Sequence, residues 1–372
     1  MSRGNIKIVL LVKSIDGGTG SFVLDLLDLK KIVGKNTQIQ IVVLEKPSFR
    51  KIINKDIIFI NPQKFYPQKY FLSFRNIFNF FYEILILRSK LSKIEPDVIL
   101  SIDLHCNILS YFEKVLLLNK FKIIFSFHIN LMETIKNKSV FPVNLILSLL
   151  VRFTYNRADA LVSVSKELAV EIKRDFNIRK KINTIYIGID TKGRIKNTKG
   201  KIIFSAGRFV EQKDFFTLID AFKILSEKLP QYKLLVAGDG PQKKELQEYS
   251  KGNQKIKFLG WKQNLSTIFK SSSLFILSSR REGLPYVLLE AMSYGLPIIS
   301  TDAAYGPSEI IGKNEFGLLV PIGNKEEMKN AMNTILKTKN QKFYSKKSLE
   351  RSKSFSKENM LNEYSKLINR LI

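Results

Sequence analysis

The sequence predicts an α/β protein built from two doubly wound, Rossmann-like domains. Short runs rich in Val, Ile and Leu alternate with longer amphipathic stretches, as in parallel strands that are buried on both faces and joined by helices. The alternation stops at a polar, basic stretch over 191–200 and then starts again. The chain of 372 residues is long enough for two domains, each with its own core.

The first alternation covers residues 1–190. It opens with the apolar run Ile6–Val12, a glycine-rich loop over 16–20, and Val23, Leu26 and Leu27 at helical spacing. This order predicts a strand, a loop and a helix. Further strands are expected at 39–44, 57–60, 98–102, 123–127, 160–164 and 184–187. We therefore expect one parallel sheet in this part of the chain.

The second alternation covers residues 201–355, after the expected linker. Strands are expected at 202–206, 234–237, 256–259, 274–277, 298–301 and 318–320, with helices such as 216–229 between them. The segment 356–372 predicts a last amphipathic helix that packs back towards the first domain. Such sheets bind ligands at the carboxyl ends of their strands, so two facing domains imply a cleft between them.

Composition excludes several classes of protein. With 45% hydrophobic and 25% charged residues, the chain is expected to fold rather than to stay disordered. No apolar run reaches the ~18–20 uncharged residues that cross a bilayer, and we expect no cleavable signal. One cysteine, Cys106, and two histidines exclude an internal disulfide framework and a multi-Cys or His-rich metal centre. We expect a cytoplasmic protein with no cofactor and no metal, peripheral at most to the inner face of the cell membrane.

The net charge of +28 is spread over both halves of the chain. Nucleic-acid binding, attraction to an anionic membrane, or a bias of the source genome towards Lys, Ile, Asn and Phe would each produce it. No helix-turn-helix, zinc or RNA-recognition signature is present, so we expect no nucleic-acid partner. Charge alone does not separate the other two explanations.

Two glutamates mark the first candidate site. Glu290 is the single charge in the stretch 283–301. A carboxylate in so apolar a setting needs hydrogen-bonding partners, which either an ion pair or vicinal sugar hydroxyls would supply. Glu282 lies eight residues earlier in an expected strand-to-helix loop. There Gly283 lets the backbone approach a ligand, and the helix amino terminus favours a phosphate or a sugar.

A second loop, 205–214, directly follows an expected strand and carries two cations. Gly207 frees the turn, and Arg208 and Lys213 lie within one loop. Cations at the carboxyl end of a strand can hold a diphosphate and stabilise it as it leaves. The alternative is a pair of solvated surface cations. The turn 238–241 ends the next strand and would line the same cleft.

Five segments, taken in order, resemble the donor-binding half of glycosyltransferase family 4. They are Gly-Arg-Phe-Val-Glu-Gln-Lys-Asp from 207, Ala-Gly-Asp-Gly-Pro from 237, Phe-Leu-Gly-Trp from 258, Ser-Ser-Arg-Arg-Glu-Gly-Leu-Pro-Tyr-Val-Leu-Leu-Glu-Ala-Met from 278, and Gly-Leu-Leu-Val from 317. The first domain resembles the family more weakly, at 17–18, 96–98, 127–128 and 162–165. The resemblance implies the GT-B fold, a nucleotide-sugar donor, retention of anomeric configuration and no catalytic metal ion.

The resemblance also implies roles for the donor-side residues. Arg208 and Lys213 would hold the donor diphosphate. Glu290 would accept hydrogen bonds from the ribose, and Glu282 would contact hydroxyls of the donor sugar. Negative charge that develops beside the two cations would be stabilised without a metal.

Four further residues take roles from the same resemblance. The backbone amides of Gly283 and Leu284 would reach the sugar or the distal phosphate. Gly18 would let the first loop approach the diphosphate. His128 would face the donor sugar in catalysis, although a lone histidine after a strand is often a boundary residue. At 186–190 the sequence is Tyr-Ile-Gly-Ile-Asp, where the family has Asn in the second place, so one amide contact is lost.

The implied reaction moves a hexose or an N-acetylhexosamine, expected from a UDP-sugar, onto a saccharide in cell-surface glycan assembly. Basic, aromatic segments at 70–93 (with Arg75, Arg88, Lys90 and Lys93) and 136–157 suit docking on an anionic membrane that carries a polyprenyl-diphosphate-linked saccharide acceptor. Ordinary core helices are the alternative. The loop 301–309 resembles members that transfer N-acetylhexosamines onto such carriers. Two other functions stay open: a GT-B nucleotide-sugar epimerase, and a basic nucleic-acid- or membrane-binding protein without catalysis.

Overall fold

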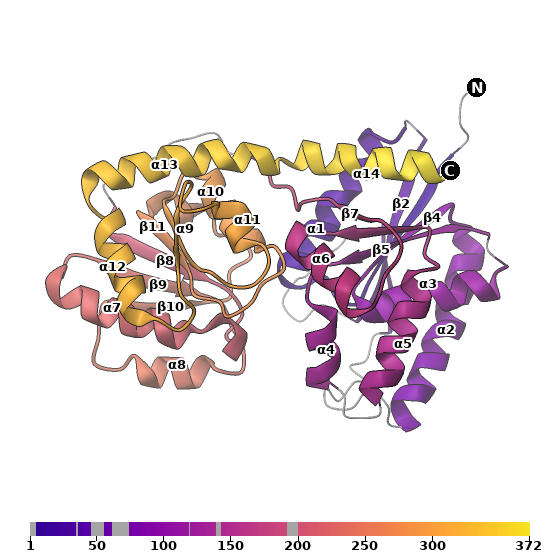
Figure 1. Cartoon of the computed structure of the whole chain (residues 1–372), viewed down its shortest axis with the longest axis horizontal. Coiled ribbons are helices and arrows are strands. Elements are labelled where there is room, and N and C mark those ends of the chain that lie inside the picture. The colour runs from indigo at the N-terminus through magenta and orange to yellow at the C-terminus, as the bar shows by residue number, and fades with distance from the viewer. Residues whose placement is uncertain are drawn as a thin grey trace. The chain divides into compact units, whose positions relative to one another are not determined.

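The computed structural model describes residues 5–34, 36–45, 56–61, 74–118, 120–138, 143–191 and 200–372. The chain divides into two compact units, one of Met1–Tyr186 with Met360–Ile372 and one of Ile187–Asn359 (Figure 1). Residues 192–199 of the expected linker lie outside the described residues. Among the described helices, none combines the length and the apolar character that a membrane span requires.

In the first unit, the described strands form one parallel sheet in the order β3-β2-β1-β4-β5-β6-β7. The strands are β1 (Lys7–Val12), β2 (Gln38–Glu45), β3 (Ile57–Asn61), β4 (Val98–Ile102), β5 (Lys122–Phe127), β6 (Ala160–Ser163) and β7 (Ile182–Thr184). The helices are α1 (Gly17–Asp25), α2 (Phe74–Ile94), α3 (Leu104–Leu116), α4 (Leu131–Lys138), α5 (Val143–Tyr155), α6 (Lys166–Asp175) and most of α14 (Lys357–Leu371). The prediction of strand 184–187 is wrong by about two residues, because β7 is only half-buried and lacks a continuous apolar run.

The second unit holds a parallel sheet in the order β10-β9-β8-β11-β12-β13. Its strands are β8 (Ile202–Ala206), β9 (Lys233–Ala237), β10 (Ile256–Gly260), β11 (Leu274–Leu277), β12 (Ile298–Thr301) and β13 (Leu318–Val320). Its helices are α7 (Phe215–Lys228), α8 (Lys243–Tyr249), α9 (Ser266–Ser271), α10 (Tyr286–Ser293), α11 (Pro307–Ile311), α12 (Lys325–Ile335) and α13 (Thr338–Ser352). The predicted α/β class with two doubly wound sheets is confirmed.

Both sheets reverse their strand order beside their first strand. The reversal lies between β1 and β4 in the first unit and between β8 and β11 in the second. Loops that leave the two strands at such a point run in opposite directions, and the crevice between them is where doubly wound sheets bind ligands. In the second unit these are the loops after Ala206 and after Leu277, which carry the predicted donor residues.

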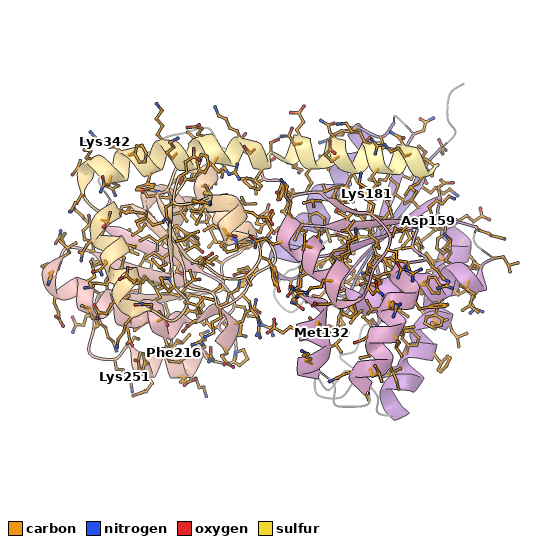
Figure 2. The ribbon with its side chains drawn as sticks, viewed as in Figure 1. Met132, Asp159, Lys181, Phe216, Lys251 and Lys342 are labelled. Carbon is orange, nitrogen blue, oxygen red and sulfur yellow. The ribbon has the colours of Figure 1, made fainter. Side chains whose placement is uncertain are left out.

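The core of the second unit fixes where these loops start. Leu218 and Phe222 on α7 are fully buried against the sheet, together with Met328 and Met332 on α12. Truncation of such a phenylalanine to alanine typically costs about 3–5 kcal/mol of stability. Phe216 of α7, labelled in Figure 2, packs against this core, and its ring meets that of Tyr249 edge-on with centroids 5.1 Å apart. The strands from which these loops leave are therefore held in place by a densely packed core.

The last helix contributes to the first unit. Met360, Tyr364 and Ile368 of α14 are buried, and they recur at helical spacing. The ring centroid of Tyr364 lies 6.1 Å from that of Phe22 on α1. Residues far apart in the sequence thus share one core in this unit.

Candidate functional site

An ion pair joins the two loops at the reversal point of the second sheet. Nζ of Lys213 lies 2.5 Å from Oε1 of Glu282, and the hydroxyl of Ser279 donates to the same oxygen over 2.5 Å. The Lys213 side chain is 18% exposed and that of Glu282 only 8%. Because two donors meet one carboxylate oxygen, the buried negative charge of Glu282 is compensated.

Hydrogen bonds between the two loops hold this pair in place. The side-chain amide of Gln212 donates to the carbonyl of Arg281 over 2.9 Å, and the N–H of Arg280 donates to the carbonyl of Gln212 over 2.8 Å. Asp214 adopts a φ of +44° and caps α7, and its carboxylate also pairs with the Arg280 guanidinium at 3.1 Å. The backbone on both sides of Lys213 is therefore fixed.

Glycines let a third loop approach the first. A Cβ on Gly238, whose φ is +152°, would lie 1.9 Å from the carbonyl oxygen of Gly207. The N–H of Phe209 donates to the carbonyl of Asp239 over 2.9 Å. The loops after β8 and β9 therefore touch backbone to backbone, and a side chain at Gly238 would push them apart.

The loop after β12 supports the residues that follow Glu282. The N–H of Glu282 donates to the carbonyl of Ala304 over 3.2 Å. A Cβ on Gly306, whose φ is +83°, would lie 2.6 Å from the carbonyl oxygen of Gly283. Gly283 and Leu284 are buried, yet their N–H groups donate no hydrogen bond to any described residue. Buried amides that precede a helix and lack partners are suited to bind an anion or a hydroxyl.

The other predicted donor side chains follow the same two strands, Arg208 in the loop after β8 and Glu290 on α10 after β11. Arg208 is exposed, and its guanidinium makes no ion pair or hydrogen bond with the described residues. Glu290 is half-buried on α10. Burial raises the pKa of Tyr294, and the negative charge of Glu290, one helical turn away, raises it further. Of the predicted donor side chains, Lys213 and Glu282 are in direct contact.

In the first unit, His128 lies in a buried polar chain. Its Nε2 is 3.1 Å from Oγ of Ser126, which lies 3.4 Å from the hydroxyl of Tyr364. Phe22 meets the imidazole edge-on at 4.6 Å between centroids. Burial lowers the pKa of His128 to about 3. The ring is therefore neutral at physiological pH and can donate one hydrogen bond and accept one.

Gly18 and Gly20 have different surroundings in the glycine loop of the first unit. Gly18 is exposed in the first turn of α1. A close approach of the chain to itself occurs at Gly20, where a Cβ would lie 1.8 Å from the carbonyl oxygen of Ile15. The role of Gly20 depends on how α1 packs on its own loop, which the sequence pattern does not indicate.

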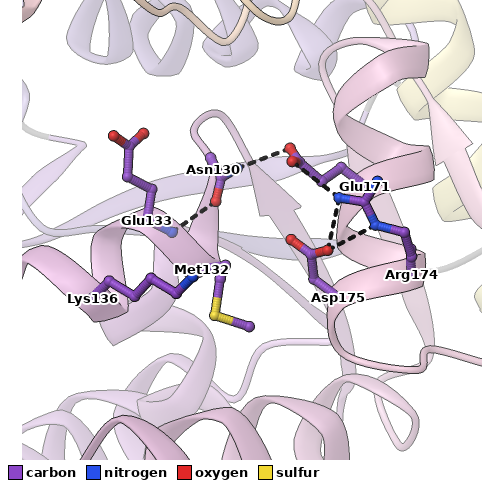
Figure 3. Close-up of a pocket in the computed structure, with 7 residues that line it drawn as sticks. All are labelled: Asn130, Met132, Glu133, Lys136, Glu171, Arg174 and Asp175. Atoms are coloured by element: carbon purple, nitrogen blue, oxygen red, sulfur yellow. Dashed lines mark hydrogen bonds and ion pairs between the residues drawn. The ribbon is translucent and has the colours of Figure 1, made fainter.

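A pocket between α4 and α6 was not predicted. Its volume is about 430 Å³, and it is lined by Asn130, Met132, Glu133, Lys136, Glu171, Arg174 and Asp175 (Figure 3). Asn130 accepts the N–H of Glu133 and donates to Glu171, each over 2.8 Å. Burial and the charge of Asp175 raise the pKa of Glu171. Asn130 follows His128 by two residues and caps α4. An asparagine at an expected helix start is the sequence signal that could have indicated this pocket.

The predicted basic segment 70–93 is described only in part. The side chain of Arg75 lies outside the described residues, whereas Lys93 is exposed on α2 and Arg88 and Lys90 are half-exposed. Nε of Arg88 lies 3.8 Å from Oε2 of Glu113, whose carboxylate is fully buried and makes no hydrogen bond with the part of the chain that the structure describes. Burial raises the pKa of Glu113 to about 7, against the opposing effect of Arg88.

Two family models match adjoining parts of the sequence. Glycosyltransferase Family 4 matches residues 39–192, and Glycosyl transferases group 1 matches residues 189–354. The second match contains Lys213, Glu282 and the loops around them. The predicted family resemblance is confirmed.

Individual relatives are glycosyltransferases of bacteria and archaea. The N-acetylgalactosamine-N,N'-diacetylbacillosaminyl-diphospho-undecaprenol 4-alpha-N-acetylgalactosaminyltransferase of Campylobacter jejuni is 30% identical over 58% of this chain and 61% of its own length. The amylovoran biosynthesis glycosyltransferase AmsD of Erwinia amylovora is 30% identical over 45% of this chain and 48% of its own. The chain thus spans about half the length of the curated relatives it matches.

Solved structures confirm the fold along the whole chain. Sucrose-phosphate synthase of Thermosynechococcus elongatus superposes with a TM-score of 0.78 at 17% identity, covering 98% of this chain and 99% of that one. Anabaena HepE in complex with UDP and glucose gives 0.75 at 17% identity, covering 98% and 100%. The predicted GT-B fold is confirmed.

Proposed function

We propose that this chain, which matches a family 4 model and a group 1 glycosyltransferase model over adjoining segments, transfers a sugar from a nucleotide sugar to a hydroxyl of a saccharide. The arrangement around Glu282 is the observation that carries this proposal. There a buried ion pair adjoins two buried amides that donate to no described residue, at the reversal point of the second sheet. This combination of a cation and spare N–H donors suits the phosphates and hydroxyls of a sugar donor.

The donor residues act together in the proposed reaction. Arg208 and Lys213 bind the diphosphate, Glu282 and the amides of Gly283 and Leu284 orient the sugar, and Glu290 binds the ribose. As the bond from C1 to the phosphate oxygen breaks, negative charge grows on the diphosphate beside the two cations. The proposal needs no metal and no cofactor.

The acceptor hydroxyl attacks C1 on the face that the diphosphate leaves, so the anomeric configuration is retained. A new C1–O bond forms, and the hydroxyl proton moves to a phosphate oxygen. His128, neutral because burial lowers its pKa, donates a hydrogen bond to the sugar without adding positive charge. Gly18 leaves room at the amino terminus of α1 for the diphosphate.

Relatives support a narrower choice of substrates. The Campylobacter enzyme is named for transfer of N-acetylgalactosamine to an undecaprenol-linked saccharide, and HepE was solved with UDP and glucose. We accordingly propose a UDP-hexose or UDP-N-acetylhexosamine as the donor, and a polyprenyl-diphosphate-linked saccharide at an anionic membrane surface as the acceptor. The carboxylates and the amide of the α4–α6 pocket suit saccharide hydroxyls on the acceptor side.

Thermal unfolding of the purified chain with a panel of nucleotide sugars tests the donor site. We expect UDP and one UDP-sugar to raise the melting temperature, and Glu290→Ala to remove most of that shift, because ligand binding to the folded state stabilises it. If no nucleotide sugar shifts the melting temperature, the donor assignment is wrong. Release of a free epimerised sugar nucleotide would instead support the epimerase, and salt-sensitive retention on DNA without nucleotide binding would support the non-catalytic alternative.

A further inference from the structure

Three neighbouring helices of the first unit expose apolar side chains. Helix α3 contacts α2 on one side and α5 on the other (Figure 1). The exposed residues are Phe81, Tyr82 and Leu85 on α2, Val115 and Leu116 on α3, and Leu145, Ile146, Leu149 and Phe153 on α5, each at least 45% exposed. Single exposed apolar residues are common on protein surfaces, whereas a contiguous group marks a place of interaction. We call this group the three-helix face.

Aromatic contacts make the face continuous. The ring of Phe80 on α2 lies 5.7 Å from that of Phe112 on α3. Tyr111 lies 6.3 Å from Phe112 and 5.8 Å from Phe153 on α5. The guanidinium of Arg157 then covers Phe153 at 3.7 Å from its centroid. Packed rings therefore connect α2, α3 and α5, from Phe80 to the exposed Phe153.

The charges on these helices are strongly segregated. The three helices contain two acidic residues, Glu83 and Glu113, and both are buried, at 1% and 0% exposure. Lys93 on α2, Arg152 on α5 and Arg157 just beyond α5 are exposed. Within the described part of the three helices the exposed charge is therefore basic, and Arg157 lies directly over the exposed Phe153, whereas the exposed Glu95 follows the end of α2.

We propose that the three-helix face docks this unit on an anionic lipid bilayer. The apolar side chains would enter the boundary between headgroups and acyl chains, while the flanking cations would meet lipid phosphates. A second copy of the chain is disfavoured as the occupant, because a two-fold contact would place these cations against one another. The role of docking in the reaction rests on the proposed function, in which the acceptor is lipid-linked. The binding of the chain to vesicles does not depend on that acceptor.

Sedimentation of the purified full chain with vesicles tests the proposal. We expect binding to vesicles of phosphatidylcholine mixed with phosphatidylglycerol, weak binding to phosphatidylcholine alone, and release at high salt. Arg152→Gln with Arg157→Gln should weaken binding about 25-fold, from the usual contribution of two cations near an anionic surface. Ile146→Ser with Leu149→Ser should weaken it about tenfold through lost apolar burial.

Matched controls come from α6 of the same unit. Val170→Ser removes a side chain that is 68% exposed, and Lys173→Gln removes an exposed cation away from the face. Both controls should bind vesicles as the parent chain does. Melting temperatures of all variants show whether each one is folded, so that loss of binding is compared only among folded chains.

Several results would overturn the proposal: no binding, equal binding to neutral and anionic vesicles, or equal loss in the controls. A concentration-dependent dimer that the face variants abolish would assign the face to a second copy instead. The UDP-dependent thermal shift, measured on the same preparations, keeps the two proposals separate. A normal shift without vesicle binding contradicts docking alone, whereas vesicle binding without a shift supports docking and contradicts the donor site.

Discussion

Nζ of Lys213 lies 2.5 Å from Oε1 of Glu282, although 69 positions of sequence separate the two residues. The pair closes the gap between the loops after β8 and β11. Both side chains are largely buried, so removal of one partner leaves a poorly solvated charge. The same two residues are the ones to which the proposed reaction assigns the diphosphate and the sugar.

We expect Lys213→Met to lower the free energy of unfolding by about 2–4 kcal/mol, because Glu282 would lose its partner. Addition of Glu282→Gln should recover part of this stability, since no buried charge then remains, while UDP binding stays impaired. Urea unfolding and UDP titration measure the two effects. Lys243→Met serves as the control: it breaks the more exposed pair with Asp239, and a change within about 1 kcal/mol is expected. A loss as large as that of Lys213→Met would contradict the importance of burial.

A substitution at Arg208 should change UDP binding without changing the stability of the unliganded chain. Its guanidinium is exposed and has no partner among the described residues. Arg208→Gln should therefore leave the melting temperature of the unliganded chain unchanged and weaken UDP binding by about tenfold or more, as for a charge-assisted contact to phosphate. Calorimetric titration with UDP provides the measurement. Unaltered affinity would remove Arg208 from the donor site.

We expect that only glycine at position 306 allows the loops of the site to approach each other. Its Cβ position lies 2.6 Å from the carbonyl of Gly283, so Gly306→Ala would displace the loop whose amides face the proposed ligand. We expect lower stability and weaker UDP binding. Gly323→Ala provides the control, because Gly323 has a similar φ of +71° but nothing within 4 Å of its Cβ position. The control should show only the backbone strain of about 1 kcal/mol and normal UDP binding. Equal loss in both variants would mean that close approach is unimportant.

Glu113 should make the chain less stable as the pH rises. Burial raises its pKa from 4.5 to about 7 in the folded chain, so the folded state binds more protons between these values. Its contribution to stability is complete below about pH 4.5 and is lost as the pH rises through about 7. At about pH 8, Glu113→Gln should therefore be more stable than the parent chain by about 1–3 kcal/mol, with little difference near about pH 4.5. Urea unfolding at both pH values provides the measurement. Glu363→Gln, on an exposed side chain of the same unit, should show no such trend.

His128 should have the opposite effect. Burial lowers its pKa from 6.5 to about 3, so the unfolded chain binds the proton first as the pH falls. The contribution of His128 to stability is fully present above about pH 6.5 and decreases towards about pH 3. Between about pH 6.5 and pH 5 the parent chain should lose about 2 kcal/mol of unfolding free energy through this histidine, and His128→Gln should not show that loss. In a transfer assay the variant should also be about 100-fold slower, while the parent chain shows no titration near pH 6.5 that belongs to this histidine. A rate limb near pH 6.5 that disappears in the variant would contradict a neutral imidazole.

The strands could be predicted because a strand buried on both faces is a continuous apolar run. The runs at 98–102, 202–206 and 274–277 coincide with β4, β8 and β11 to the residue. The prediction was poorest at β7, which is half-buried and therefore lacks that signal. For the donor site, the motif order and the loop positions followed from the sequence. The contact between Lys213 and Glu282 did not.

The sequence by itself determined the alternation of strands and helices, the family motifs, and the placement of charged residues directly after particular strands. These features are local, and each is encoded in fewer than about twenty consecutive residues. Tertiary structure decided which loops meet, which glycines face a backbone carbonyl, and that Tyr364 completes the polar chain of His128. It also decided that Glu83 and Glu113 are buried while their apolar neighbours face solvent. Burial and pairing depend on residues that are distant in the chain, so they arise only when the helices pack on their sheets.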